Sequence, residues 1–288
     1  MKILKPLFFG LILFLSLNCS VTKNQTSGSV TPENFNQQIE FTTLKTVMIL
    51  PFVIDGVPKN FLFDTGADLS IIQRDSTIGE TRNFNGASNR KMRLGQENVN
   101  SMKLGEIDFR NTMAGNGDLV GLKEQISNFG GIIGQPIISK ANWLIDYPNK
   151  KLLVSNKNLV DETFKTIRIK REGVSPYTYI AINGKKHKVI IDFGSSSEFN
   201  LPKDSKLARQ LLQLYDFEDN ERRRYTLGGL QTITEKIGIL PLIKLGDLEF
   251  ENVKTTINIS SQPRIGIGFF KDCIVYIDNL DDSYKIKK

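Results

Sequence analysis

Apolar residues dominate two neighbouring stretches, residues 46–54 and 59–63. A short apolar run bounded by turn residues is typical of a strand buried in a core. Asp55-Gly56 lies between the two stretches, and Asp-Gly is a preferred pair for the two-residue turn of a hairpin. The second stretch stops at Asp64, which a threonine and a glycine follow. The pattern therefore predicts a β-hairpin that ends in a loop presenting a carboxylate.

This pattern recurs in the second half of the chain. Gly56 and Asp64 are matched by Gly184 and Asp192, each 128 residues later. Three further pairs of segments match in the same order, and they are residues 103–111 with 244–252, 132–134 with 266–268, and 143–146 with 275–278. Blocks matched in one order indicate an internal duplication, and its period is too long for a solenoid repeat. Each copy is therefore expected to be a small β-domain.

The remaining segments add loops and short helices. Residues 75–90 and 225–232 are polar, contain glycine and occupy corresponding places in the two halves, so loops or hairpins are expected there. Pro136 is expected to open a short helix and Ser205 to cap a longer one. The apolar residues of the longer helix have a spacing that predicts one buried stripe, and they are Leu207, Leu211, Leu212, Leu214 and Tyr215.

Composition excludes several classes of function. The chain has 288 residues, of which 40% are hydrophobic and 24% charged, as in an ordinary globular protein with room for two modest cores. The net charge of +7 is scattered apart from Arg222-Arg223-Arg224, which no interleaved aromatic residues accompany, so no nucleic acid is expected as a partner. His187 is the single histidine, which removes His-based triads and most zinc sites. We expect neither a metal nor another cofactor.

The first residues differ from the rest of the chain. Two lysines precede the uncharged residues 6–17, which predicts a signal peptide over residues 1–18 that is too short to span a membrane. Cys19 follows, and a polar stretch then predicts a flexible tether over residues 19–40. Cys273 is the other cysteine and is expected to be a small buried residue.

This arrangement resembles a bacterial lipoprotein signal, although Ser16 stands where leucine is usual. The resemblance implies a lipid on Cys19 and a protein exported to the bacterial cell envelope, anchored to a membrane and facing the periplasm or the outside. The alternative is simple secretion after cleavage nearby.

The ordered set of motifs resembles the aspartic proteases, with a bilobed plan like that of pepsin and compact lobes like those of the retroviral enzymes. Asp64-Thr65-Gly66-Ala67-Asp68 fits the retroviral motif at every position, whereas Asp192-Phe193-Gly194-Ser195-Ser196 has phenylalanine where the family has threonine or serine. The resemblance covers residues 45–288. It implies a mainly β fold of two pseudo-symmetric acid-protease-like β-barrel lobes with a few short helices, over residues 41–158 and 159–288.

The same resemblance implies an interlobe cleft in which Asp64 and Asp192 are the catalytic pair, share a proton and activate a water that hydrolyses a peptide bond. The substrate would be a peptide or protein, covered by a flap whose tip lies near residues 86–88. The substrate-binding residues implied are Thr65, Gly66, Ala67, Asp68, Gly194, Ser195 and Ser196. If the Ser195 hydroxyl bonds its neighbouring carboxylate, Asp192 is the ionised partner and Asp64 the acid.

Two functions from different classes remain. The first is an exported aspartic endopeptidase, which retention of both aspartates favours. The second is a catalytically inactive peptide-binding lipoprotein with the same fold, which Phe193 favours.

Overall fold

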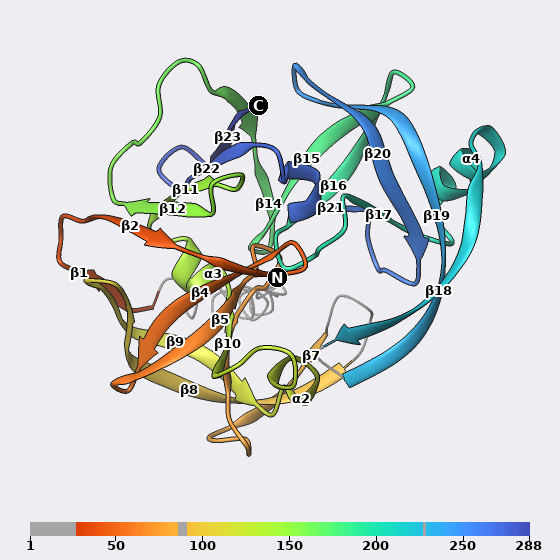
Figure 1. Ribbon diagram of the computed structural model, residues 1–288. Coiled ribbons are helices and arrows are strands. Elements are labelled where there is room, and N and C mark those ends of the chain that lie inside the picture. The colour runs from red at the N-terminus through yellow and green to blue at the C-terminus, as the bar shows by residue number, and fades with distance from the viewer. Residues whose placement is uncertain (1–26, 86–90, 227–228) are drawn as a thin grey trace, which may run out of the picture.

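Strands make up most of the structure, and the helices are few and short (Figure 1). This computed structural model describes residues 27–85, 91–226 and 229–288. The predicted signal peptide, Cys19 and the predicted flap tip at residues 86–88 lie outside the described residues. The helices of the described part are α2 (Val120–Lys123), α3 (Gln135–Ile138), α4 (Lys206–Leu214) and the 3-10 helix η1 (Ile267–Phe270).

In the first half, six strands pair in a closed ring. In ring order they are β4 (Val47–Ile54), β5 (Val57–Phe63), β10 (Phe129–Ile133), β6 (Ser70–Gln73), β9 (Ile107–Gly117) and β8 (Lys91–Leu104). The ring closes because β8 also pairs with β4. Three strands extend it, and they are β1 (Ser29–Thr31) on β9, β3 (Thr42–Leu44) on β4 and β7 (Thr81–Asn85) on β8.

The second half repeats this order of pairing. Its ring consists of β15 (Ser175–Ile182), β16 (Lys185–Asp192), β21 (Arg264–Gly266), β17 (Phe199–Pro202), β20 (Leu248–Asn258) and β19 (Gly229–Leu245), and β19 pairs with β15 to close it. The directions match as well, because β5 is parallel to β10 and β16 is parallel to β21. Two outer strands are β14 (Lys170–Glu172) on β15 and β18 (Phe217–Thr226) on β19.

The predicted hairpin turns are confirmed. Asp55 and Asn183 both adopt positive φ, at 52° and 49°, and a glycine with positive φ follows each. That sequence of two left-handed residues matches the twist of the flanking strands and needs Asp-Gly or Asn-Gly. The two repeated aspartates are thus placed at the ends of equivalent strands.

A third sheet joins the two halves. Its order is β13 (Lys165–Arg168), β23 (Ser283–Lys287), β22 (Ile274–Asp278), β11 (Asn142–Asp146), β12 (Lys151–Ser155) and β2 (Asn36–Glu40). At its centre β11 pairs antiparallel with β22, so strands from residues 41–158 and 159–288 share one sheet.

The tether predicted for residues 19–40 is wrong in its last part. Residues 36–40 form β2, which pairs with β12 along its whole length, and β1 pairs with β9. Phe35 is buried beside β2, and its backbone amide donates to the side chain of Asn156 at 3.3 Å. Backbone pairing and one buried ring hold this segment despite its polar composition.

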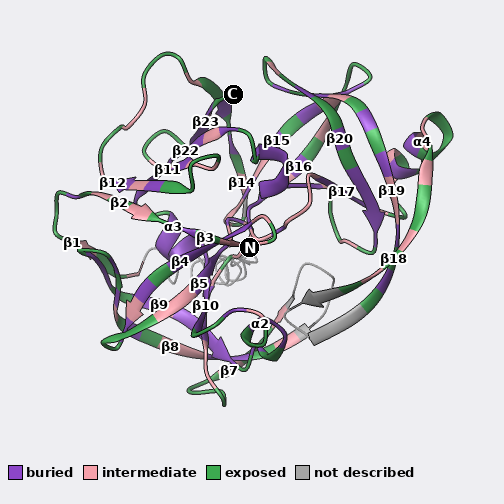
Figure 2. Ribbon diagram, in the orientation of Figure 1, coloured by how far each residue is buried: buried purple, intermediate pink, exposed green. Residues whose placement is uncertain are grey.

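Buried segments occur on strands of both halves and in α3, whereas the outer loops are exposed (Figure 2). The core of the first half includes Trp143, which stacks on Phe109 with the ring centroids 6.3 Å apart. In the second half, Phe193 packs on Phe270 with the ring centroids 5.6 Å apart. Cys273 is buried, as predicted.

The stripe predicted for α4 is confirmed in part, because Leu211 is buried and both Leu207 and Tyr215 pack partly buried against the core. Ala208 and Leu211 are its buried residues, while Leu212 and Leu214 are exposed. This nine-residue helix contacts the ring through β17, so only a narrow face is covered. The predicted cap is confirmed, since the Ala208 amide donates to the Ser205 hydroxyl at 3.1 Å.

Candidate functional site

The two repeated aspartates meet where the two rings adjoin. Asp64 directly follows β5, and Asp192 is the last residue of β16. Their carboxyl groups are hydrogen-bonded to each other. Asp192 is buried, with 5% of its surface exposed, whereas Asp64 is half-buried. The structure thus brings together the two residues that the sequence predicts as a pair.

Two glycines allow this approach. A Cβ atom on Gly66 would lie 3.0 Å from Cγ of Asp192, and one on Gly194 would lie 2.3 Å from Cγ of Asp64. Each glycine therefore lies against the aspartate of the other half, and a side chain at position 194 has no room unless the pair moves apart.

The environment of Asp64 favours its protonated form. Removal of water around the carboxyl raises the pKa of Asp64 well above its usual range, and the negative charge of Asp192 raises it further. The Gly66 amide, which donates to Asp64 Oδ1 at 2.8 Å, acts in the opposite direction. Two carboxyl groups in contact cannot both ionise cheaply, and this repulsion is part of what raises the pKa of Asp64.

Arg264 is part of the site and was not predicted. Its Nη1 donates to Asp192 Oδ2 in a buried ion pair, and the arginine is 8% exposed. Arg264 lies on β21 opposite Ile190 of the parallel strand β16, which brings its side chain to the end of that strand. The charge that balances Asp192 therefore comes from the strand next to it.

The repeat could have identified Arg264, but one pair of glycines in the two halves was matched wrongly. The repeat, as its sequence pattern predicts it, pairs Gly134 with Gly268. In the structure Gly134 approaches the carbonyl oxygens of Ala67 and Leu69, and Gly266 approaches those of Ser195 and Ser197. The counterpart of Gly134 is therefore Gly266, two residues earlier. With that match, Arg264 stands where the first half has the buried Ile132.

Thr65 bridges the two halves. Its hydroxyl donates to the carbonyl oxygen of Ile191 at 2.9 Å and accepts from the Phe193 amide at 3.0 Å. Phe193, which matches Thr65 in the second half, has no hydroxyl to bond the first half in return. Its ring is fully buried, with its centroid 6.1 Å from that of Tyr284. Burial raises the pKa of Tyr284, whose phenol also contacts the Thr65 hydroxyl. One half thus contributes a hydroxyl at this position and the other an apolar ring.

The expectation for Ser195 is wrong. Its hydroxyl is hydrogen-bonded to that of Ser197 at 2.7 Å, and Arg264 occupies the place beside Asp192 that Ser195 was expected to fill. The raised pKa of Asp64, which burial and Asp192 cause, favours its protonated form without a contribution from the Ser195 hydroxyl.

The outer residues of the two loops also contact the opposite half. Asp68 Oδ1 accepts from the Ser175 hydroxyl at 2.8 Å, and the Ser196 carbonyl oxygen accepts from the Thr46 hydroxyl at 3.0 Å. Ala67 packs partly buried against the core. These contacts tie the first loop to β15 and the second loop to the turn between β3 and β4.

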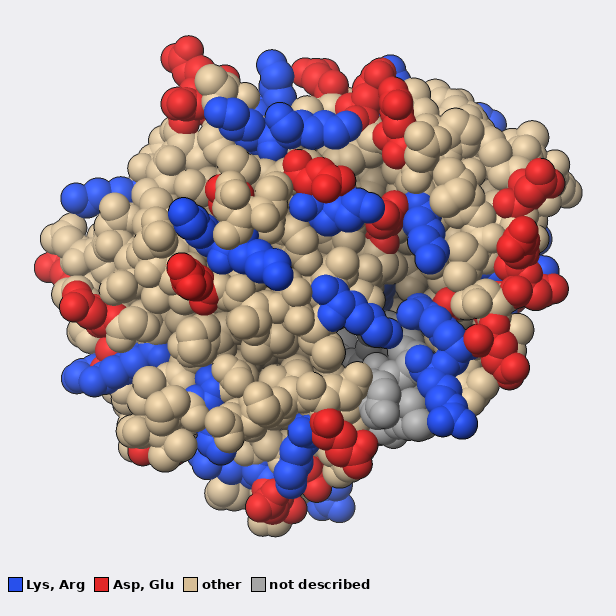
Figure 3. All heavy atoms as spheres, viewed as in Figure 1, with Lys and Arg blue, Asp and Glu red and all other residues tan. Residues whose placement is uncertain are grey.

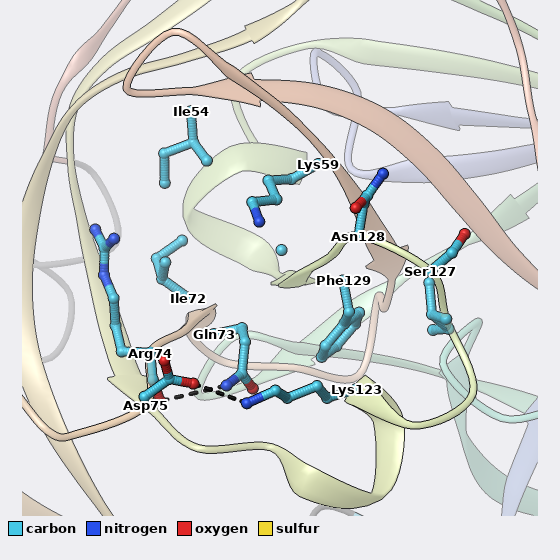
Figure 4. Close-up of a pocket in the computed structure, with 12 residues that line it drawn as sticks. Ile54, Lys59, Ile72, Gln73, Arg74, Asp75, Lys123, Ser127, Asn128 and Phe129 are labelled. Atoms are coloured by element: carbon cyan, nitrogen blue, oxygen red, sulfur yellow. Dashed lines mark hydrogen bonds and ion pairs between the residues drawn. The ribbon is translucent and has the colours of Figure 1, made fainter.

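A cavity of about 520 Å³ lies elsewhere, at the start of β5, whereas Asp64 follows the end of that strand (Figure 4). Its walls combine apolar Ile72 and Phe129 with basic Lys59 and Lys123, and Lys123 is bonded to an aspartate at 2.7 Å. The carboxylate pair does not line this cavity. On the face shown in Figure 3, basic side chains lie among acidic ones.

Over residues 27–85, 91–226 and 229–288, no group of three or more His, Cys, Asp or Glu residues is placed to hold a metal ion. In that same part of the chain, no helix is long and apolar enough to cross a membrane. No protein-family model and no curated protein sequence matches the chain.

Proposed function

We propose that the protein is an aspartic endopeptidase that hydrolyses peptide bonds with a water activated between Asp64 and Asp192. The observation that carries this proposal is the hydrogen bond between the two carboxyl groups, together with the raised pKa of Asp64. One protonated and one charged carboxyl group at contact distance are the acid and base that amide hydrolysis needs without a metal.

The order of strand pairing supports an aspartic protease fold of two pseudo-symmetric lobes. Each ring has the same sequence of parallel and antiparallel partners, and each delivers its aspartate from an equivalent strand. The hairpins β7–β8 and β18–β19 occupy equivalent places and are candidates for the flaps over a cleft between the lobes. Gly66 and Gly194 let each loop lie close against the aspartate of the other lobe.

In the proposed reaction, the oxygen of the water forms a bond to the carbonyl carbon while the charged Asp192 takes one of the water's protons. Asp64 gives its proton to the carbonyl oxygen, so a gem-diol forms. When the C–N bond breaks, the amine nitrogen takes the proton from Asp192 and a diol hydroxyl returns one to Asp64. Both carboxyl groups then regain their starting states.

Arg264 favours the second candidate, a peptide-binding protein without catalytic activity. Its guanidinium is bonded to Oδ2 of Asp192, the carboxylate that must accept a proton from water. Phe193 also favours this candidate, because its ring packs on Phe270 and supplies no hydroxyl to the loop of the other lobe. The two functions share the fold and the peptide partner and differ in whether the bond is cut.

We further propose that the protein is exported and anchored through a lipid on Cys19. The apolar run that precedes Cys19 and the polar residues that follow it support this placement. Membrane fractionation of Cys19→Ala tests it, since the variant should move to the soluble fraction. Unchanged membrane association would show that another segment holds the protein.

A mixed peptide library tests the proposed activity. Full-length protein is incubated with the library from acid to neutral pH, and new termini are identified by mass spectrometry. Asp64→Asn and Asp192→Asn, which keep the size of each side chain, are the matched controls and should abolish cutting. Binding without cutting at every pH would favour the peptide-binding protein.

A further inference from the structure

Arg264 is a buried charged residue of this site whose matched position in the first half carries no charge. The first-half position that matches it is Ile132, which is 3% exposed. Placing a guanidinium at such a position removes it from water, and this is costly unless a partner of opposite charge compensates it. Asp192 is that partner, and it is itself buried.

The surroundings of Arg264 provide little other compensation. Its Nε atom has no hydrogen-bond partner among the described residues. Asn200, which lies opposite Arg264 across the antiparallel pair β17–β21, also has a buried carbonyl oxygen, Oδ1, without a partner in that part of the chain. The arginine is therefore not the centre of a separate polar network, and its ion pair with Asp192 is the interaction that accounts for its place in the fold.

We propose that Arg264 is a positioning residue that holds the negative charge of the pair on Asp192 and thereby leaves the proton on Asp64. Asp192 Oδ2 accepts from the guanidinium, and Asp64 has a backbone amide and Asp192 as its partners. A cation on one side of a symmetric carboxyl pair makes its two protonation states unequal. The acid and base roles are thus assigned before a substrate binds. The part of this inference that concerns acid and base roles rests on the proposed function, whereas the placement of charge does not.

The charges that act on the pair come from few elements. Arg264 on β21 lowers the pKa of Asp64 slightly, against the larger opposing effects of burial and of Asp192. The strand β17 contributes neutral Asn200, and α3 contributes neutral Gln135, which donates to the Thr65 carbonyl oxygen at 2.6 Å. Behind Thr65, Tyr284 stays uncharged because burial raises its pKa, and Arg171 lies near that phenol.

Thermal unfolding across pH tests the placement of charge without any need for activity. Arg264→Met removes the cation and keeps most of the side-chain volume. At neutral pH it should lower the melting temperature by about 10 °C, because a buried carboxylate loses its partner. The loss should shrink as the pH falls, because both aspartates then become neutral.

Two further variants separate charge from packing. Arg264→Met combined with Asp192→Asn removes both charges and should recover most of the melting temperature at neutral pH. Arg264→Lys keeps the cation and should lie between the wild type and Arg264→Met. An equal loss for Arg264→Met at every pH, or no recovery in the double variant, would show that Arg264 acts by packing alone and would overturn the proposal.

The pH profile of peptide cleavage adds a second readout. In Arg264→Lys, which retains the cation, the alkaline limb should stay near that of the wild type. In Arg264→Met it should move to higher pH, because Asp64 then keeps its proton longer. If the wild type cuts no peptide, the proposed activity fails while the unfolding series still decides the role of Arg264.

Discussion

The loops that carry Asp64 and Asp192 have the same backbone but different chemistry around it. In each loop an amide three residues on bonds back to the carbonyl oxygen of the aspartate, at 3.3 Å in the first half and 3.1 Å in the second. In the first half, Thr65 supplies a bridging hydroxyl and Ile132 leaves Asp64 without a counter-ion. In the second, Phe193 supplies a buried ring and Arg264 a cation.

The difference teaches that the duplicated backbone sets where the carboxyl groups lie, whereas the surrounding side chains set which of them is charged. The second half depends on apolar packing for its loop, and the first half depends on hydrogen bonds. Substitutions at matching positions of the two loops should therefore have different effects.

The largest effect is expected where the ring replaces the hydroxyl. Phe193 is fully buried against Phe270 and Tyr284, so Phe193→Ala should reduce the free energy of unfolding by about 3–5 kcal/mol. Denaturant unfolding measures the loss. Phe193→Thr tests whether a hydroxyl compensates in function, and it should change peptide cleavage less than Asp192→Asn does. A loss below about 1 kcal/mol for Phe193→Ala would contradict the packing role.

The glycines should show a smaller and unequal effect. Gly194→Ala places a methyl group 2.3 Å from Asp64 Cγ, whereas Gly66→Ala places one 3.0 Å from Asp192 Cγ. Overpacking of this kind costs about 1–3 kcal/mol, and Gly194→Ala should be the more destabilising of the two. It should also reduce activity more. Equal unfolding midpoints for the two variants would show that the space beside Gly66 and the space beside Gly194 do not differ.

The smallest effect is expected at the bridging hydroxyl. Thr65→Val keeps the shape but removes both hydrogen bonds to the second half, at a net cost of about 1 kcal/mol. Thr65→Ser retains the hydroxyl and is the control. Should the two variants unfold at the same denaturant concentration, the hydroxyl contributes nothing and the bridge is only a contact.

The fold was readable in outline because its signals are local. Asp55-Gly56 and the repeated aspartate give the hairpin and its end, and both depend on residues that adjoin in sequence. The closure of each ring by β8 with β4 and by β19 with β15 depends on pairing between distant strands. Such pairing leaves no periodic pattern of its own. The segment of residues 36–40 was missed for the same reason, because backbone pairing with β12 holds it.

The sequence predicted the two aspartates of the site but not the side chains that surround them. Asp64 and Asp192 followed from the repeat, since equivalent strands deliver them. Arg264 was overlooked because Gly266-Ile267-Gly268 also fits an apolar-glycine pattern, and only the approach of Gly266 to Ser195 fixes the correct match. The partner of the Ser195 hydroxyl depends on its rotamer and on a neighbour at Ser197, which the motif does not determine.

Comparing the wild type with Asp64→Asn for the pH dependence of unfolding tests whether the two halves form one proton-sharing pair. Asp64 has a pKa raised by burial and by Asp192, so its contribution to stability is full below about pH 4 and is lost as the pH rises through the folded-state value. The variant has no such carboxyl group. Its stability relative to the wild type should therefore increase as the pH rises above about 4. Asp75→Asn is the control of opposite sign, because Lys123 lowers the pKa of Asp75. A stability difference between Asp64→Asn and the wild type that is constant across pH, or that falls as the pH rises, would contradict the shared pair.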